Sequence, residues 1–339
     1  MILVLNCGSQ SIKWKVFDDK LKLVKEGKSV VLQQDFFKES LSGELKKISG
    51  LQIDAIGHRV VHGGKKFINP IRITEENLTE LEKLNHLAPL HNPFNILGIK
   101  ACQNIFKGIP EFAVFDTEFF NYLPEKSYTY ALPELIAKES GFRRYGFQGI
   151  SHRYVAQKAA EIAKKPFNKL KIITCHLGGG ASITAIKNGK AIDTSMGFTP
   201  LEGLVMMTRS GNIDAGIVLE LVREFTLSRT EEILSKESGI KGICGEGDML
   251  KVLEKIKEGD KKSKLALDIF VYSVQKYIGA YFAILGGCDI LVFTGAIGSG
   301  SAKIRNMICK DLKILGKTKI MAIETDEESV IAGKITINL

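Results

Sequence analysis

The chain has 339 residues, 45% of them hydrophobic and 25% charged, which is typical of a globular protein long enough for two domains. Its six cysteines are scattered, with neither a Cys-x-x-Cys pair nor histidines at ligand spacing, which argues against a disulfide framework or a zinc site and favours the reducing cytoplasm. The net charge of +9 comes without a basic run interleaved with aromatic residues, and no apolar run is long enough to span a bilayer, so we expect neither nucleic acid nor a membrane as partner.

The first segment, LVLNCGSQSIKWKVF (Leu3–Phe17), predicts a strand, a polar turn and a second strand. The turn holds a glycine and two serines, and Lys13 follows it. Backbone N–H groups, hydroxyls and a lysine gathered in this way can bind phosphate oxygens. An ordinary tight hairpin is the alternative interpretation of one such turn.

Strands and helices then alternate. A short buried strand and a Gly-rich bend are predicted within Ile53–Phe67, helices over Glu75–Leu87 and Asn95–Phe106, and an apolar strand over Glu111–Phe120 that carries Asp116. This alternation indicates an α/β architecture.

The middle of the chain repeats the organisation of the start. Residues Lys171–Ser195 again predict strand, small-residue turn and strand, which suggests a duplicated core with one hairpin in each domain. An apolar stripe predicts a helix over Lys264–Leu285, followed by a buried strand over Ile290–Thr294 and a Gly-rich loop over Gly295–Arg305 that opens a helix. Neither a P-loop nor a dinucleotide fingerprint is present, so any phosphates are expected in the β-hairpins.

Seven segments of the chain resemble the acetate kinase family, and they occur in the same order as in that family. They are GHRVVHGG (57–64), LAPLHNP (87–93), VFDTEF (114–119), RRYGFQGISHRYV (143–155), CHLGGGASI (175–183), DTSMGFTPLEGLVMMTRSG (193–211) and VFTGAIG (292–298). The resemblance implies the two-domain α/β fold of actin, hexokinase and the heat-shock chaperone ATPases, with a duplicated mixed-sheet core. It implies an N-terminal domain over residues 1–118, to which the tail 330–339 returns, and a second domain over 119–329 with the nucleotide site and a dimer interface.

The reaction implied by the resemblance is the reversible, direct in-line transfer of the γ-phosphoryl group of ATP to acetate, which gives acetyl phosphate and ADP. Mg²⁺, or Mn²⁺ in its place, is the implied cofactor, and a homodimer is the implied assembly. Acetate is already ionised at neutral pH, so no general base is required. The catalytic task is to bring one anion against a polyanion and to stabilise the charge of the transferring group.

The resemblance also assigns roles to single residues. Arg59 is expected to hold the acetate carboxylate and Arg209 the phosphoryl group in flight. Asp116 resembles the aspartate that acts on the magnesium shell and on nucleophile alignment, and Asn6 and Glu327 match the magnesium-associated positions. Oxygen ligands of this kind suit a hard ion that keeps several waters.

Further positions follow from the same motifs. His91 matches an active-site histidine, although a structural core histidine is the competing interpretation. The acyl pocket is expected to be small and apolar, because acetate offers one methyl group; besides Arg59, its residues are Val61, Leu90, Phe147 and Pro200. The nucleotide and phosphate groups are expected at Ser9, Ser11, Lys13, His176, Leu177, Gly178, Gly179, Gly180, Asp248, Met249, Leu250, Ala296, Ile297, Gly298, Ser299 and Gly300.

The chain departs from the family pattern mainly on the nucleotide side. Gln148 replaces a histidine expected to stabilise the transition state, Gly179 replaces an asparagine and Leu250 replaces an arginine. The early variable region and the segment between Gly316 and Ala322 are shortened, and the last family helix is expected as a short tail after Ile331.

Three functions therefore remain open: an acetate kinase with a modified ATP site, an acyl kinase of the same family that uses propionate or another donor such as pyrophosphate, and a catalytically weak regulatory protein that binds nucleotide or acyl phosphate.

Overall fold

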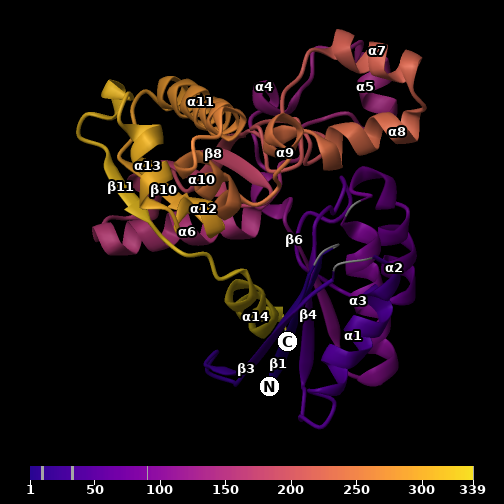
Figure 1. Cartoon of the computed structure of the whole chain (residues 1–339). Coiled ribbons are helices and arrows are strands. Elements are labelled where there is room, and N and C mark those ends of the chain that lie inside the picture. Colours follow the sequence, from indigo (N-terminus) through magenta and orange to yellow (C-terminus); the bar gives the residue numbers. More distant parts are fainter. Residues whose placement is uncertain (9–10, 32–33, 90, 339) are drawn as a thin grey trace. The chain divides into compact units, whose positions relative to one another are not determined.

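The computed structural model describes residues 1–8, 11–31, 34–89 and 91–338 (Figure 1). The predicted site residues Ser9 and Leu90 lie outside them. The chain forms two compact units. The N-terminal unit comprises Met1–Asn121, Phe147–Ile150 and Asp326–Leu339, and the C-terminal unit comprises Tyr122–Gly146 and Ser151–Thr325. None of the described helices combines the length and the apolarity needed to cross a bilayer.

The N-terminal unit is built on a mixed sheet with the strand order β3-β2-β1-β4-β6-β5. Strands β1 and β2 form an antiparallel hairpin, and β4 and β6 add to β1 in parallel. Its strands are β1 (Ile2–Gly8), β2 (Ser11–Phe17), β3 (Leu23–Val30), β4 (Ala55–Val60), β5 (Ile71–Arg72) and β6 (Glu111–Phe115). Its helices are α1 (Phe37–Lys46), α2 (Glu75–Glu82), α3 (Asn92–Ile105) and α14 (Glu327–Asn338).

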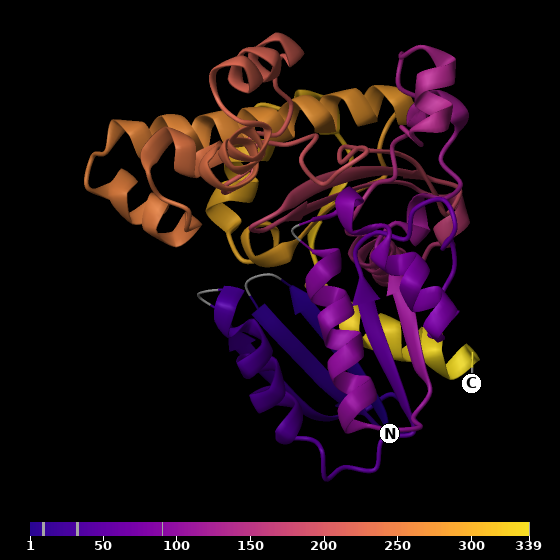
Figure 2. The same cartoon turned by 90° about the vertical axis from the view of Figure 1, so that its right-hand side faces the viewer.

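Two apolar layers enclose this sheet. Alternation along β2 sends Ile12, Trp14 and Val16 into a core completed by helices α1 and α3. The opposite face packs against Ile331 and Ile335 of α14. Figure 2 shows the yellow α14 on one side of the strands and the indigo and purple helices on the other. The polar face of β1 and β2 therefore shares its side of the sheet with α14.

Two sequence expectations in this unit are corrected. The strand predicted over Glu111–Phe120 ends at Phe115, and a short 3-10 turn at Glu118–Phe120 follows Asp116. The chain end is no short tail, since α14 is a helix of 12 residues. This helix forms because its apolar residues find a buried partner on the sheet, which local sequence cannot reveal.

The C-terminal unit repeats five strands of this topology, without a counterpart of the edge strand β5 among its described residues, in the order β11-β10-β7-β8-β9. An antiparallel hairpin, β7–β8, is again followed on one side by a further antiparallel strand and on the other by parallel strands. The expectation of a mixed α/β fold with a duplicated core is confirmed. Its strands are β7 (Lys171–Leu177), β8 (Ala181–Lys187), β9 (Lys190–Thr194), β10 (Ile290–Thr294) and β11 (Lys319–Ala322).

Helices of the C-terminal unit cover its sheet and extend from it. They are α4 (Glu125–Tyr128), α5 (Glu134–Glu139), α6 (Gly149–Ala163, whose first two residues belong to the N-terminal unit), α7 (Ala215–Glu224), α8 (Leu227–Glu232), α9 (Gly239–Cys244), α10 (Met249–Lys257), α11 (Lys261–Leu285), α12 (Gly295–Gly298) and α13 (Ala302–Cys309). The predicted Gly-rich loop over Gly295–Arg305 thus contains a helical turn of its own, α12, before α13 begins.

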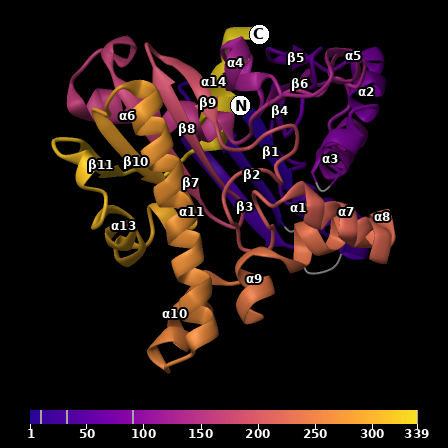
Figure 3. The ribbon, with the colours of Figure 1, turned by 90° about the horizontal axis from the view of Figure 1, so that it is seen from above.

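Helix α11 lies along β7 and β8 (Figure 3). The predicted stripe is confirmed, because its residues Leu267, Phe270, Val274, Ile278, Tyr281 and Leu285 are all buried. Asp260 caps the first turn by accepting from Ser263 N at 2.9 Å. The helix ends at Gly286, whose φ of 65° is readily adopted only by glycine.

Candidate active site

Arg59 and Asp116 form a bidentate ion pair in the N-terminal unit. Arg59 is the fifth residue of β4, and Asp116 directly follows the neighbouring β6. Arg59 Nε donates to Asp116 Oδ1 at 3.1 Å, and Nη2 donates to Oδ2 at 2.6 Å. The aspartate is 1% exposed, whereas the arginine side chain keeps 19% exposure. The pair fixes the plane of a guanidinium that an anion can still reach.

Asn6 and Glu327 lie at the same guanidinium. Arg59 Nη1 is 3.3 Å from Asn6 Oδ1 and 3.3 Å from Glu327 Oε2. The structure thus brings together four of the predicted site residues from β1, β4, the end of β6 and the start of α14. These segments are far apart in sequence and meet because parallel strands end at one edge of the sheet.

Burial and ion pairing have opposite effects on the pKa values of Arg59 and Asp116. Burial raises the pKa of the Asp116 carboxyl, which Arg59 offsets only in part. Burial alone would lower the pKa of Arg59, but attraction by Asp116 and Glu327 outweighs it and raises that pKa above its usual value. Arg59 therefore stays a cation at every physiological pH.

The same residues fit a magnesium ion. The described residues contain no group of three or more His, Cys, Asp or Glu side chains that forms a ready-made metal site. Mg²⁺ does not need one, because it usually keeps several waters and takes one or two carboxylates together with substrate phosphates. Asn6 and Glu327 offer the amide and carboxylate oxygens for this kind of site.

One residue at this cluster was missed by the sequence analysis. Glu328 is 8% exposed, accepts from Asn6 Nδ2 at 3.1 Å, and lies 3.7 Å from Lys15 Nζ. Lys15 also pairs with Asp326 at 2.8 Å. The two consecutive glutamates in the segment TDEES were the available signal, but only the helical start of α14 decides which of them faces Asn6.

The turn at Gln148 is bound to Asp116. Gln148 has a φ of 58°, an uncommon value for a residue other than glycine. Its backbone N–H donates to the Asp116 carboxylate, and Gly149 N donates to Asp116 O at 3.0 Å. A Cβ atom at Gly149 would overlap that carbonyl oxygen. The backbone conformation at Gln148 is therefore fixed by close contact with the aspartate.

Part of the predicted acyl pocket lies in the same unit. Val61 is buried, and its N–H donates to Asn95 Oδ1 at 3.0 Å. Phe147 is buried and packs edge-on against His62, with ring centroids 5.3 Å apart. His91 stands at the N-terminal end of α3, and its N–H donates to Ala88 O at 2.9 Å.

On the hairpin β1–β2, for which phosphate binding is predicted, Ser11 is half-buried and pairs with Gly8. Lys13 is exposed and lies opposite Asn6 in the strand register, so both side chains point to the same face. This is the face that also carries Arg59 and α14, which fits a lysine that reaches an anion above the sheet.

The C-terminal unit brings two predicted nucleotide segments side by side. The first set is His176 and Leu177 at the end of β7 with the turn Gly178–Gly180, and the second set is helix α12 with Ser299 and Gly300. A Cβ at Gly178 would lie 3.9 Å from Ala296 N, and one at Gly298 would lie 3.4 Å from Cys175 O. Ser151 Oγ orients His176 through a 2.8 Å bond to Nδ1. Backbone N–H groups and glycines at one place are suited to phosphate oxygens.

Residues Asp248–Leu250 serve a structural purpose in this unit. Asp248 is the N-cap of α10 and accepts from Leu250 N at 2.7 Å. Met249 is buried, whereas the Leu250 side chain is 72% exposed. A contact of Asp248 and Leu250 with nucleotide stays a prediction.

Arg209 has surroundings that differ from those of Arg59. Its Nη1 donates to Pro200 O at 3.1 Å and lies 3.8 Å from Met206 Sδ. Burial lowers the pKa of Arg209 to about 10, whereas at Arg59 carboxylates reverse the effect of burial. A cation that has lost hydration in this way gains most from an arriving anion.

His152, the second histidine of its motif, is fully buried in the C-terminal unit. Nδ1 is 2.7 Å from Thr174 Oγ1, and Nε2 is 2.7 Å from Ser182 Oγ. Burial, and then the nearby His176, lower the pKa of His152 well below its ordinary value. The folded protein therefore holds this imidazole neutral.

This neutral histidine predicts a pH dependence of stability. In the unfolded chain its pKa returns to about 6.5, so the unfolded state binds an extra proton below that pH. The contribution of His152 is fully present above pH 6.5 and is lost as the pH falls, with a slope that approaches about 1.4 kcal/mol per pH unit. We expect urea denaturation at pH 7, 6 and 5 to show a shallower fall for His152→Gln than for the parent. Parallel pH profiles would contradict the assignment.

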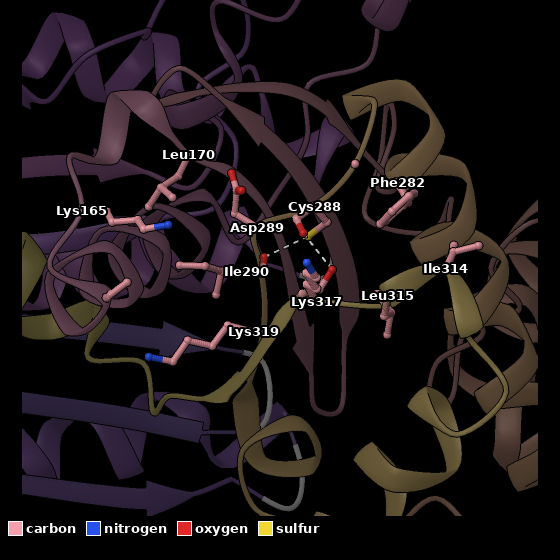
Figure 4. Close-up of a pocket in the computed structure, with 13 residues that line it drawn as sticks. Lys165, Leu170, Phe282, Cys288, Asp289, Ile290, Ile314, Leu315, Lys317 and Lys319 are labelled. Atoms are coloured by element: carbon pink, nitrogen blue, oxygen red, sulfur yellow. Dashed lines mark hydrogen bonds between the residues drawn. The ribbon is translucent and has the colours of Figure 1, made fainter.

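A pocket of about 500 Å³ in the C-terminal unit lies elsewhere (Figure 4). The pocket lies at the amino-terminal ends of three strands. Its lining includes Ile290 and Lys319, the first residues of β10 and β11, and Leu170, which directly precedes β7. The predicted nucleotide turns follow the opposite, carboxyl ends of β7 and β10. Ligands of open α/β sheets bind at carboxyl ends, so this pocket is distinct from the candidate site.

Comparison with known proteins identifies the family. The model of the acetokinase family matches residues 35–334. The acetate kinase of Carboxydothermus hydrogenoformans is 44% identical over 395 aligned residues, which cover 100% of this chain and 98% of that protein. Acetate kinase 2 of Clostridium perfringens is 43% identical over 96% of this chain and 89% of that protein. The 395-residue alignment exceeds the 339 residues of this chain, so the Carboxydothermus protein has segments that are missing here.

Solved structures agree. The acetate kinase of Porphyromonas gingivalis matches with a TM-score of 0.88 and 36% identity over 100% of this chain and 99% of that one. A propionate kinase from Francisella tularensis matches with a TM-score of 0.88 and 37% identity over 98% of both chains. A ROK family protein from Streptococcus pneumoniae, 12% identical with a TM-score of 0.50, shares the fold alone. The expected two-domain, actin-like fold is confirmed, and the chain belongs to the acetokinase family, phosphotransferases with a carboxyl group as acceptor.

Proposed function

We propose that this protein transfers the γ-phosphoryl group of Mg-ATP directly and reversibly to acetate, giving acetyl phosphate and ADP. The observation that carries the proposal is the Arg59 guanidinium, oriented by a bidentate pair with Asp116 next to Asn6 and Glu327. An ionised carboxylate substrate needs an oriented cation and no general base, and Arg59 is such a cation.

Each residue then has a defined task. Arg59 binds the acetate carboxylate and turns one oxygen towards the γ-phosphorus. Attack by that oxygen forms the new O–P bond as the bond to the β-phosphate oxygen breaks, and ADP leaves with the electron pair. Arg209 binds the phosphoryl oxygens as charge redistributes among them. Mg²⁺, held through Asn6 and Glu327, would neutralise charge on the phosphates.

Nucleotide is proposed to bind at the turns of the C-terminal unit. The turn Gly178–Gly180 and the start of α12 offer backbone N–H groups there, and His176 and Leu177 precede this turn. Ser11 and Lys13 of β2 are further proposed phosphate contacts. A cytoplasmic location is proposed as well, because all six cysteines are free thiols, as is usual in a reducing compartment.

The test is a screen of donors and acceptors. ATP, GTP and pyrophosphate are each combined with acetate or propionate and Mg²⁺, and acyl phosphate is trapped as the hydroxamate. The proposal predicts most product from ATP with acetate. Product formed with pyrophosphate but not with ATP would show that pyrophosphate is the phosphoryl donor. If no donor gave product while ATP still raised the melting temperature, the protein would be a nucleotide-binding protein and not a kinase.

Propionate is the second acceptor that an observation favours. The similar Francisella tularensis structure is described as a propionate kinase. The wall residues Val61 and Phe147 are buried in this chain, and one extra methylene in an apolar pocket changes discrimination by only about 1–3 kcal/mol. We therefore expect propionate to be a slower substrate.

Restoring a histidine at position 148 is expected to raise kcat. A glutamine amide donates a hydrogen bond but carries no charge, and one charged donor to the transferring group contributes about 10²-fold in rate. The backbone φ of 58° suits histidine, which is enriched in this conformation. Steady-state kinetics of Gln148→His test this, with Gln148→Ala as the control that should be slower than the parent. A lower or unchanged rate in Gln148→His would show that the site is adapted to the amide.

A homodimer is proposed from an uncovered helix. No described residue of α7 is buried, although Ile217, Leu219 and Val222 are apolar, and Phe225 and Leu227 continue the exposed surface. Several exposed apolar side chains in one segment are typical of a surface that another protein covers, and a second copy of the chain would cover this one. Sedimentation analysis should give twice the chain mass of 37.4 kDa. A concentration-independent single-chain mass would rule the dimer out.

A further inference from the structure

A cluster of three side chains fixes the segment 195–202 of the C-terminal unit. Arg144 Nη2 donates to Glu202 Oε1 at 2.6 Å, and the Tyr130 hydroxyl donates to Glu202 Oε2. The guanidinium carbon of Arg144 lies 5.6 Å from the centre of the Tyr130 ring. We call Tyr130, Arg144 and Glu202 the Glu202 clamp. Neither the sequence motifs nor the proposed mechanism gives these residues a role.

Arg144 binds three places at once. Besides Glu202, its Nε donates to Ser127 O at 3.2 Å and its Nη1 donates to Ser195 O at 3.2 Å. Its own backbone N donates to Tyr128 O at 2.7 Å. Burial disfavours the charge, but attraction by Glu202 outweighs burial and raises the pKa of Arg144 above its usual value. The charged guanidinium thus links Ser127 to Ser195 and Glu202.

The backbone between Ser195 and Glu202 is shaped to this cluster. Phe198 N donates to the Tyr130 hydroxyl at 2.9 Å, and Gly197 O accepts from Tyr145 N at 3.0 Å. A Cβ atom at Gly197 would overlap Glu202 Oε2 and the Tyr130 hydroxyl. The Tyr130 hydroxyl therefore donates to the Glu202 carboxylate and accepts from the Phe198 N–H. These two bonds fix the position of the segment 195–202.

This segment carries the residue that holds Arg209. Pro200 lies between Phe198, whose N–H donates to Tyr130, and Glu202, a member of the clamp. The carbonyl oxygen of Pro200 accepts from Arg209 Nη1 at 3.1 Å. A shift of the segment would move the carbonyl that orients this guanidinium. Such a shift would also move the Pro200 ring, which is expected to form one wall of the acyl pocket.

We propose that Tyr130, Arg144 and Glu202 are positioning residues that set the Arg209 guanidinium and the Pro200 wall for phosphoryl transfer to the acid. The inference rests on the proposed function, since it concerns the same site. A misplacement of about 1 Å at a reacting group lowers rates by about 10²-fold. Loss of the clamp should therefore lower kcat and the preference for acetate over propionate, while KM for ATP stays unchanged.

The variants separate positioning from simple stability. Glu202→Gln keeps the shape but loses the charge, Arg144→Lys keeps the charge but loses the three-way fork, and Tyr130→Phe removes one hydroxyl. Asp268→Asn is the matched control, because it removes the charge of an exposed ion pair with Lys264 on α11, at 2.5 Å. The control is expected to match the parent in kcat, selectivity and melting temperature.

The experiment combines kinetics with a crystal structure of Glu202→Gln. We expect kcat to fall by about 10²-fold in Glu202→Gln and less in Tyr130→Phe, and the Arg209–Pro200 contact to be lost. Unchanged kcat in folded Glu202→Gln and Tyr130→Phe, or a retained contact in the crystal, would overturn the positioning role. An inactive parent enzyme would instead remove the proposed function on which the role depends, a result that the variants cannot imitate.

Discussion

Arg209→Ala is expected to lower kcat by about 10³-fold with little change in KM for acetate, because its contact with the phosphoryl oxygens forms mainly in the transition state. Stability should hardly change. Burial lowers the pKa of Arg209 to about 10, so the folded protein gains little from keeping this cation desolvated. Large catalytic loss without unfolding distinguishes a catalytic arginine from a structural one.

Steady-state kinetics and thermal denaturation of the same preparations test this. Arg209→Lys is the matched variant, which keeps a charge but not the planar fork, and should fall between the parent and alanine. Near-parental kcat in Arg209→Ala would refute the role. A raised KM for acetate with unchanged kcat would move Arg209 to ground-state acetate binding.

Arg59→Met is expected to lose both activity and stability. Asp116 is 1% exposed and would keep a buried charge without its bidentate partner. Breaking a buried ion pair by removing one member costs about 3–5 kcal/mol. Acetate would also lose the cation that binds it, so KM for acetate should rise beyond the measurable range.

A second variant separates the two effects. Arg59→Met combined with Asp116→Asn removes both charges, so it should recover most of the lost free energy of unfolding while activity stays absent. Urea denaturation at pH 7 gives the stabilities. If Arg59→Met were as stable as the parent, the pair would not be the buried, desolvated interaction described here. If the double variant were active, Arg59 would not bind the substrate.

The sequence predicts helices and hairpins whose form depends on residues close together in the chain. The stripe of α11 has helical period and ends at a glycine, so its course follows from a few neighbouring residues. The hairpins β1–β2 and β7–β8 each have a small-residue turn between β-rich arms, and their duplication is confirmed in the two sheets. The predicted cluster of Asn6, Arg59, Asp116 and Glu327 came from motif resemblance, and the structure places these four side chains together.

Other features depend on partners far away in sequence. Glu328 meets Asn6 across 322 positions, and Arg144 meets Glu202 across 58 positions. Only the fold decides such pairs: the segment TDEES offers two adjacent glutamates without showing which one meets Asn6, and neither Arg144 nor Glu202 carries a local signal of their pairing. The 12-residue helix α14 was expected as a tail for the same reason, since its stability comes from packing on the sheet.

A crystal structure with Mg-ADP, acetate and a planar phosphoryl mimic such as aluminium fluoride tests the central claim most directly. The account predicts the Arg59 guanidinium within hydrogen-bond distance of the acetate carboxylate and the Arg209 guanidinium on the mimic. Acetate, mimic and the β-phosphate oxygen should lie in line. Either guanidinium bound only to protein groups, with acetate and mimic held by other side chains, would contradict it.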